Sequence, residues 1–207
     1  ALPIFVFVHA PRLYDDQNQG VRFVPLWAYT LAAHVPASWE PLVVDAALDP
    51  VTTAPSADVF AYTAINQDLE SVLAAHAALR AQYPSARHIL GGPITWSFEQ
   101  AGRLEELRGF DHLFVLDGEA SLPALLADLD AGRTPDRIIR GGRFPLGGAK
   151  PVRFDLLQPV ASRYYGAVIE VSRGCPFLCE FCDIRVLPEN NETHTKDPAA
   201  PLRISRP

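Results

Sequence analysis

Through its first 145 residues the chain alternates between short apolar runs and longer amphipathic segments. The apolar runs are typical of buried strands, and the amphipathic segments repeat apolar side chains every three or four positions, as helices do. Alternation of this kind favours parallel strands joined by crossover helices that cover both faces of a sheet. The sequence therefore predicts an α/β fold with a doubly wound, mostly parallel, Rossmann-like sheet.

The expected elements can be placed by their apolar runs and by the residues that end them. Strands are expected at residues 4–9, 41–45, 58–63, 87–90, 112–116 and 137–140. Helices are expected over residues 24–35, from Asn66 or Asp68, from an N-cap at Ser97, and from Ser121. The second helix is expected to bury one face, made of Leu69, Val72, Leu73, His76, Leu79 and Tyr83.

Composition changes after the last of these strands. Residues 141–151 are rich in glycine and proline and have neither a helical nor a strand period. We therefore predict a linker there, with a domain boundary at about residue 146 that separates residues 1–145 from residues 146–207. Beyond the linker, the apolar run from Ala167 to Ser172 predicts a buried strand that leads into the cysteines.

Charge and hydropathy narrow the classes of partner. The chain has 207 residues and a net charge of −6, which argues against nucleic acid as the main partner. It has no apolar run long enough to span a bilayer, so no membrane association through a spanning segment is expected. The apolar start of the chain lacks a basic region, which favours a strand over a signal peptide. Clustered cysteines suit a reducing compartment, and a cytoplasmic location is expected.

All three cysteines lie in one short stretch, at Cys175, Cys179 and Cys182, with Phe181 before the third. Three thiolates with this spacing can hold three irons of a four-iron four-sulfur cluster and leave the fourth iron open to a small molecule. A structural zinc site, completed by His194, is the alternative, and free structural thiols are a further one.

Candidate cofactor-binding residues follow three of the predicted strands. They are Thr63, Asn66, Gly91, Gly92, Pro93, Gly118 and Glu119. Open parallel sheets bind ligands at the carboxyl ends of their strands, and glycine there lets a ligand approach the backbone. No G-x-G-x-x-G follows the first strand, which argues against a dinucleotide.

Other polar residues have more ordinary interpretations. His9 is expected to be a hydrogen-bonded residue at a strand end, and Asp45 to organise a loop. His112 is expected to begin a strand. Glu119 either contacts a cofactor or is an acidic residue favouring the start of a helix.

The stretch from Arg173 to Ile184 resembles the cluster loop of radical S-adenosylmethionine (SAM) enzymes. The resemblance implies that SAM binds the open iron, that Phe181 lies near its adenine, and that an electron from the cluster cleaves SAM. Cys175, Cys179 and Cys182 would then be the metal ligands.

The first domain is similar to the cobalamin-binding domain that precedes the radical domain in one branch of that family. The similarity rests on Gly91-Gly92-Pro93, on Gly118-Glu119, on the segment from Thr63 to Asn66, and on Pro25-Leu26. It implies a cobalamin cofactor. Because the chain lacks a D-x-H-x-x-G motif, that cobalamin would be base-off with no histidine ligand from such a motif.

Together the resemblances imply the N-terminal portion of a cobalamin-dependent radical SAM methyltransferase of the class B type. A methyl group would pass from SAM, through methylcobalamin, to a small-molecule or peptide substrate, with ferredoxin or flavodoxin as electron donor. Residues 182–191 also resemble the tryptophan C-methyltransferase subgroup.

The chain after residue 167 has room for little more than the first unit of a (β/α) radical SAM barrel, so a truncated barrel and incomplete catalysis are expected. Two alternatives stay open. One is a cobalamin-binding module without complete catalysis, and the other is a radical SAM enzyme whose first domain does not bind cobalamin.

Overall fold

Six parallel strands form the central sheet of the computed structural model, which describes residues 1–12, 21–166, 168–177, 179–180 and 193–195. The strand order is β2-β1-β3-β4-β5-β6, and every pairing is parallel. The strands are β1 Ile4–His9, β2 Glu40–Asp45, β3 Val59–Thr63, β4 Arg87–Gly91, β5 His112–Val115 and β6 Ile138–Arg140. All six strands were predicted from the sequence, with bounds that differ by at most one residue at an end.

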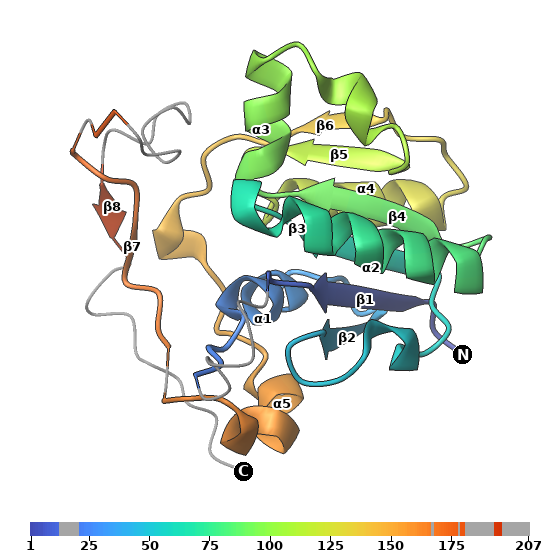
Figure 1. The fold of residues 1–207 in the computed structure, drawn as a ribbon, viewed down its shortest axis with the longest axis horizontal. Helices are drawn as coiled ribbons and strands as arrows, with labels where there is room; N and C mark the ends of the chain where they lie inside the picture. The colour runs from blue at the N-terminus through green and yellow to red at the C-terminus, as the bar shows by residue number, and fades with distance from the viewer. Residues whose placement is uncertain (13–20, 167, 178, 181–192, 196–207) are drawn as a thin grey trace.

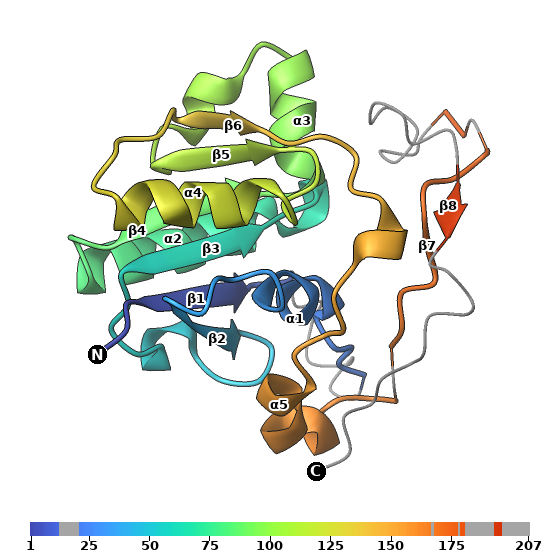
Figure 2. The ribbon, with the colours of Figure 1, turned by 180° about the vertical axis from the view of Figure 1, so that it is seen from behind.

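Helices cover both faces of this sheet, as the doubly wound prediction requires (Figures 1 and 2). The main helices are α1 Leu26–Ala32, α2 Leu69–Gln82, α3 Pro93–Gln100 and α4 Ser121–Asp130. Single 3-10 turns are η2 Val51–Thr53, η3 Asn66–Asp68 and η4 Leu104–Leu107. Within the described part of the chain, none of the helices has both the length and the apolar character needed to cross a bilayer.

Two buried clusters lie on opposite faces of the sheet because successive strand residues point to opposite sides. Val6 and Val8 of β1 face α2 and α3, whereas Phe5 and Phe7 face α1 and α4. Full burial of such side chains stabilises the fold by about 1.5–3 kcal/mol each. The clusters therefore fix which helix lies on which face.

The third main helix differs from its prediction. It begins at Pro93, so Ser97 lies inside the helix and is not its N-cap. Proline is favoured at the first helical position because its φ is already helical. Gly102, with φ +67°, follows the end of the helix, and Leu104 belongs to the separate turn η4.

Two further helix predictions need correction. The first helix spans seven residues, Leu26–Ala32, and not residues 24–35. In α2 the buried positions are Val72, Ala75 and Leu79, while Leu73 is 40% exposed and does not belong to the buried face. The packed stripe on α2 is narrower than the apolar pattern suggested.

Residues 141–164 run along the sheet domain and pack against it. Their elements are η5 Leu146–Gly148, α5 Phe154–Leu157 and η6 Gln158–Arg163. Leu146 and Tyr164 are buried, and Tyr164 packs with Val24 and Tyr29 in a third cluster. The domain boundary at residue 146 stays a prediction.

The buried strand predicted at residues 167–172 is wrong over residues 168–171. Residues 168–171 form no strand, and Ile169 and Val171 are 65% and 60% exposed. Only the two-residue strand β7 Ser172–Arg173 follows, and it pairs antiparallel with β8 His194–Thr195. A buried strand needs covered faces, and of residues 168–171 only Glu170 is partly covered. Ala167 lies outside the described residues, and no barrel unit is seen among them.

Candidate cofactor site

A cavity of about 310 Å³ opens at the carboxyl edge of the sheet. Parallel strands bring their carboxyl ends to one edge, and the pairing of Thr63 with Gly91 shows β3 and β4 in register there. Five of the predicted cofactor-binding residues line the cavity: Thr63, Gly91, Gly92, Gly118 and Glu119. Asn66 and Pro93 do not line it, and Phe181 lies outside the described residues.

The position of the cavity follows from the topology of the sheet. The chain leaves β1 toward β2 on one side and returns to β3 on the other, so α1 and α2 lie on opposite faces. The cavity lies on the α1/α4 face, with Phe7, Ala61 and Ile89 among its strand residues and with Leu31 and Leu122 contributed by the two helices. Open α/β sheets bind ligands at such a reversal of strand order.

Trp27 supplies an unpaired donor in this mostly apolar lining. The buried indole N–H has no hydrogen-bond acceptor among the described residues. The ring is held edge-on to Phe7 and His9, with centroid separations of 5.9 and 6.5 Å. An unsatisfied buried donor is unfavourable by about 1–3 kcal/mol. No local pattern indicates this unpaired donor, because the environment of the indole is set by distant residues.

Gly92 is required by the backbone around it. Its φ is +87°, and a Cβ atom there would lie 2.2 Å from Thr63 Oγ1. The buried Thr95 hydroxyl lies 2.8 Å from the carbonyl oxygen of Gly92 and 2.6 Å from that of Phe114 in β5, and its one proton can be donated to either. Thr95 therefore holds the glycine loop in place, a role that sequence reasoning missed.

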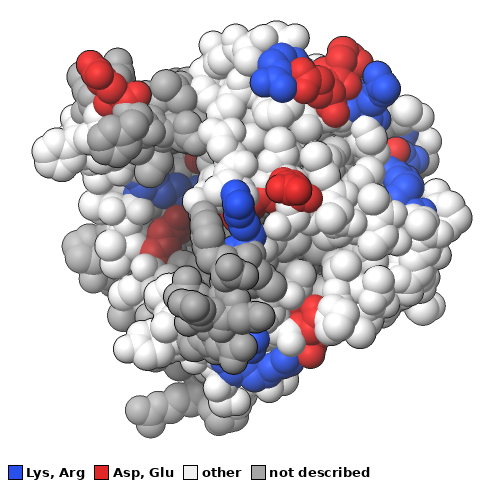
Figure 3. All heavy atoms as spheres, viewed as in Figure 1, with Lys and Arg blue, Asp and Glu red and all other residues white. Residues whose placement is uncertain are grey.

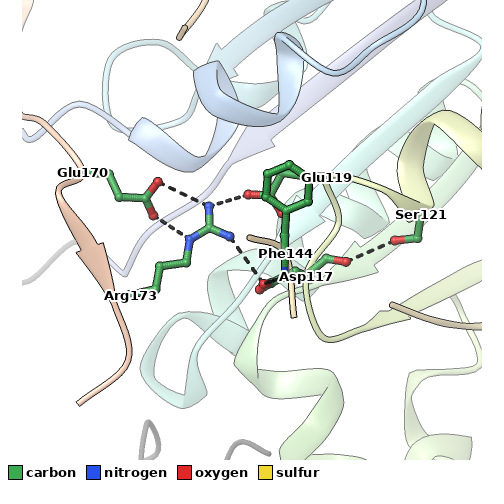
Figure 4. A network of polar contacts seen from close by, with 6 residues as sticks. All are labelled: Asp117, Glu119, Ser121, Phe144, Glu170 and Arg173. Atoms are coloured by element: carbon green, nitrogen blue, oxygen red, sulfur yellow. Dashed lines mark hydrogen bonds and ion pairs between the residues drawn. The ribbon is translucent and has the colours of Figure 1, made fainter. Parts of the chain in front are cut away.

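A network of charged groups lies at the mouth of the cavity (Figure 4). The Arg173 guanidinium donates to Glu119, which is 3% exposed, and to Glu170, with Nε 2.7 Å from Oε1. Its Nη1 lies 3.5 Å from Oδ2 of Asp117. Glu119 therefore has a third role that neither sequence interpretation foresaw, as the ion-pair partner of an arginine 54 residues away.

Three carboxylates surround one guanidinium in this network, and their environments differ. Burial raises the pKa of Asp117, and the backbone N–H of Phe144, 2.7 Å from Oδ2, opposes this shift. Burial alone would lower the pKa of Arg173, but its hydrogen bonds to Glu119 and Glu170 raise the pKa above its ordinary value. The arginine therefore stays charged, and the mouth of the cavity carries an excess of acidic groups.

The cysteine triad is only partly described. Cys175 is half-buried and Cys179 is exposed, and both are free thiols. Cys182 lies outside the described residues, so the triad stays a prediction. Among the residues that are described, no three histidine, cysteine, aspartate or glutamate side chains are arranged so that they could hold a metal ion. His194, the alternative fourth zinc ligand, pairs with Arg173 in the β7–β8 ladder.

The remaining polar residues have structural roles. Asp45 organises a loop as predicted, because its Oδ1 accepts from the backbone N–H of Ala47 at 2.8 Å. His112 begins β5 as predicted, and its Nδ1 lies 3.0 Å from the carbonyl oxygen of Asp136. Burial lowers the pKa of His9, and the charge of Asp45 opposes this shift. Neither histidine lines the cavity.

The charged surface is mixed in sign. On the face drawn in Figure 3, lysine and arginine side chains of the described residues lie beside acidic ones and form no uninterrupted basic surface. Exposed pairs contribute to this mixture, among them Arg103 with Glu106 and Arg133 with Asp128.

The chain is similar to a known protein over nearly its whole length. No protein family model matches the chain. The chain is 34% identical, over 212 aligned positions, to the uncharacterized methyltransferase sll1242 of Synechocystis sp.. The alignment covers 97% of this chain and 37% of that protein, so the chain spans little more than a third of the length of its relative.

Proposed function

We propose that the chain is the cofactor-binding N-terminal portion of a SAM-dependent methyltransferase that also uses cobalamin and an iron–sulfur cluster. The relative that matches nearly the whole chain is named a methyltransferase. The observation that carries the proposal is the ion pair between Arg173 and Glu119. Arg173 precedes Cys175 by two residues, so the cysteine-bearing segment lies against the edge of the sheet where a cofactor is expected.

The cysteines suit a metal cluster in chemical terms. Cys175 and Cys179 are free thiols, and Cys175 is half-buried, so a metal bound to it would be partly screened from water. Cys175, Cys179 and Cys182 would hold the cluster, and Phe181 would contact SAM. When bound, the cluster supplies the electron that cleaves SAM. The role of the protein is to place the thiolates near the cavity mouth.

The cavity suits one part of a cobalamin. The corrin ring is too large for a cavity of about 310 Å³. It would lie across the carboxyl edge of the sheet, near Thr63, Gly91 and Gly92. A base-off cobalamin has a free aromatic base, and an apolar cavity with one buried donor fits such a base. Its ring nitrogen would accept a hydrogen bond from the Trp27 indole. The acceptor of the methyl group would be a small molecule or a peptide, and a ferredoxin or flavodoxin would supply electrons.

A second candidate function is favoured by the charge of the mouth. Among the described residues that line the cavity, three are acidic, Asp117, Glu119 and Glu170, and one is a cation, Arg173. SAM carries a sulfonium and an ammonium group against one carboxylate, so an acidic mouth would attract it. In this candidate the cavity binds SAM directly, and the sheet domain binds no cobalamin.

Cofactor titration distinguishes the two candidates. Hydroxocobalamin added to the purified protein is expected to shift the corrin absorbance, and SAM alone is expected to bind weakly. Trp27→Phe should weaken the cobalamin affinity roughly two- to tenfold, the range for one lost hydrogen bond. Trp39→Phe is the control, because the Trp39 indole already donates to Asp130 and lies outside the cavity. Tight SAM binding with no corrin shift would favour the second candidate.

Anaerobic reconstitution tests the cluster. With iron and sulfide, the protein is expected to gain broad visible absorbance and about four irons per chain. Replacing Cys175, Cys179 and Cys182 together with alanine should abolish both signals. Uptake of zinc in tetrahedral coordination, with no iron, would instead support the zinc site completed by His194.

A further inference from the structure

Arg173 joins two parts of the chain that are far apart in sequence. Its guanidinium contacts Glu119 and Asp117 in the connection after β5, and Glu170 in its own segment (Figure 4). Nε is 2.7 Å and Nη2 is 3.3 Å from the two carboxylate oxygens of Glu170, so the guanidinium plane is fixed on one side. The other side of the same group reaches into the sheet domain.

The segment around Arg173 has few other supports among the described residues. Residues 168–171 form no strand, and the apolar side chains Ile169 and Val171 are exposed. The strand that contains Arg173 has two residues and pairs with one other two-residue strand. A segment with little buried apolar surface opens easily unless specific contacts hold it. Among the described residues, the contacts of Arg173 link this segment to the connection after β5, and β8 also lies against η5.

Removal of the guanidinium would leave an unfavourable arrangement of charges. Its side chain is 22% exposed, and that of Glu119 is 3% exposed, so water screens the pair only in part. Without the arginine, Glu119 would be a buried carboxylate facing two others. Lysine would restore the charge but not the forked geometry that serves several carboxylates at once.

The network is also part of the cavity. Arg173 and Glu170 line it together with Asp117 and Glu119, so a ligand in the cavity contacts the groups that hold the segment. Cys175 lies two residues beyond Arg173, so a shift of the backbone at Arg173 also moves Cys175. Binding in the cavity and placement of the cysteine segment should therefore influence each other, and such an influence is reciprocal.

We propose that Arg173 is a positioning residue that holds the cysteine-bearing segment over the cavity and couples cavity binding to the placement of Cys175. The identity of the cavity ligand rests on the function proposed above. The positioning itself does not, because it concerns contacts within the chain. Arg173 contacts neither substrate nor cluster in this proposal and acts through Glu119 and Asp117.

The first test uses the protein without ligand. Cys175 is alkylated with iodoacetamide, and the modified residue is located by tandem mass spectrometry over time. Arg173→Gln is expected to raise the alkylation rate of Cys175 about tenfold, a value reduced from that of a fully buried pair because the guanidinium is partly exposed. Arg173→Lys should give an intermediate rate. Equal rates in wild type and Arg173→Gln would overturn the positioning role.

Arg163→Gln is the matched control. Arg163 also ties the C-terminal half to the sheet domain, through an ion pair with Asp49 at 2.7 Å, but it does not line the cavity. Loss of the Arg163 guanidinium should leave the alkylation rate of Cys175 unchanged. Glu119→Gln provides a second route, because it removes the same pair from the sheet side without altering the cysteine segment. A raised rate in Arg163→Gln equal to that in Arg173→Gln would count against the proposal.

The second test measures the coupling. Hydroxocobalamin is expected to slow alkylation of Cys175 severalfold in wild type and in Arg163→Gln, and to have no such effect in Arg173→Gln. The same slowing in Arg173→Gln would overturn the coupling. If wild type shows no corrin spectral shift, the cobalamin part of the proposed function fails, while the ligand-free alkylation rates still decide the positioning role.

Discussion

Gly92 illustrates how a residue at a candidate site can be fixed by the fold alone. The sequence suggested that Gly91 and Gly92 allow close approach of a cofactor. A Cβ atom at Gly91 would make ordinary contact with Phe114 Cβ at 3.4 Å, whereas one at Gly92 would collide with Thr63 Oγ1. Gly92 is thus needed to form the turn, whether or not a ligand binds. At Gly91 the fold itself does not require glycine, so close approach of a ligand is a separate explanation there.

Gly92→Ala is expected to destabilise the protein by about 2–4 kcal/mol, from left-handed backbone strain and from displacement of Thr63. Urea unfolding measures the change. Gly132→Ala is the control, because Gly132 also has a positive φ, +67°, but has open space around it. That variant should lose only about 1 kcal/mol. Similar losses in the two variants would show that the contact with Thr63 has no effect.

His88 is a buried histidine with a structural role. It is fully buried, its Nδ1 lies 3.1 Å from the Tyr62 hydroxyl, and its ring stacks on that of Tyr62. Burial, together with the charge of Arg80, lowers the pKa of His88 to about 3. The His88 imidazole therefore binds a proton near pH 6.5 in the unfolded chain, whereas in the folded chain it binds one only near pH 3.

Stability from neutral His88 is therefore complete above about pH 6.5 and is lost as the pH falls toward 3. His88→Gln removes this titration and keeps a polar group near Tyr62. Its free energy of unfolding is expected to fall less steeply between pH 6.5 and 4.5, by up to about 1.4 kcal/mol per pH unit. Urea midpoints at four pH values test this, and parallel pH profiles for wild type and variant would contradict it.

At the scale of elements, the short helices after the glycine-rich segment are attached to the sheet by polar contacts. The Tyr164 hydroxyl at the end of η6 donates to Oδ2 of Asp45 at the end of β2, at 2.9 Å. Burial raises the pKa of Tyr164, and the Asp45 carboxylate raises it further. This tyrosine therefore stays protonated and remains a donor at neutral pH.

Tyr164→Phe is expected to destabilise the protein by about 1–3 kcal/mol, because Asp45 is 7% exposed and loses a donor. Tyr165→Phe is the control, since that residue is 65% exposed. Thermal unfolding compares the two. No difference between them would mean that the hydrogen bond to Asp45 contributes nothing to stability.

At the scale of the whole molecule, the predicted boundary at residue 146 can be tested by truncation. A protein of residues 1–145 loses the buried Leu146 and Tyr164, whereas one of residues 1–165 keeps both. The shorter protein is expected to be less stable by about 3 kcal/mol or more, the value for burial of two large side chains. Equal urea midpoints would support a boundary at residue 146. They would contradict a stabilising role for the buried Leu146 and Tyr164.

Much of the fold follows from local sequence. The six strands could be predicted because each is an apolar run bounded by turn residues, and these signals lie within a few positions. Predictions of features that depend on distant residues were wrong. Leu73 continues the apolar pattern of its helix but is exposed, and Ser97 resembles an N-cap although the actual N-cap is Gly92, five residues earlier.

The sequence by itself determined the α/β class, the strands and the residues at the carboxyl edge, because strand periodicity is local and parallel strands bring their ends together. Tertiary structure alone decided how those residues are used. It left the Trp27 indole without an acceptor beside the cavity, and it paired Glu119 with Arg173 across 54 positions. It also left residues 168–171 outside any strand, with Val168, Ile169 and Val171 exposed. Such outcomes depend on which distant segments meet, and no local pattern records that.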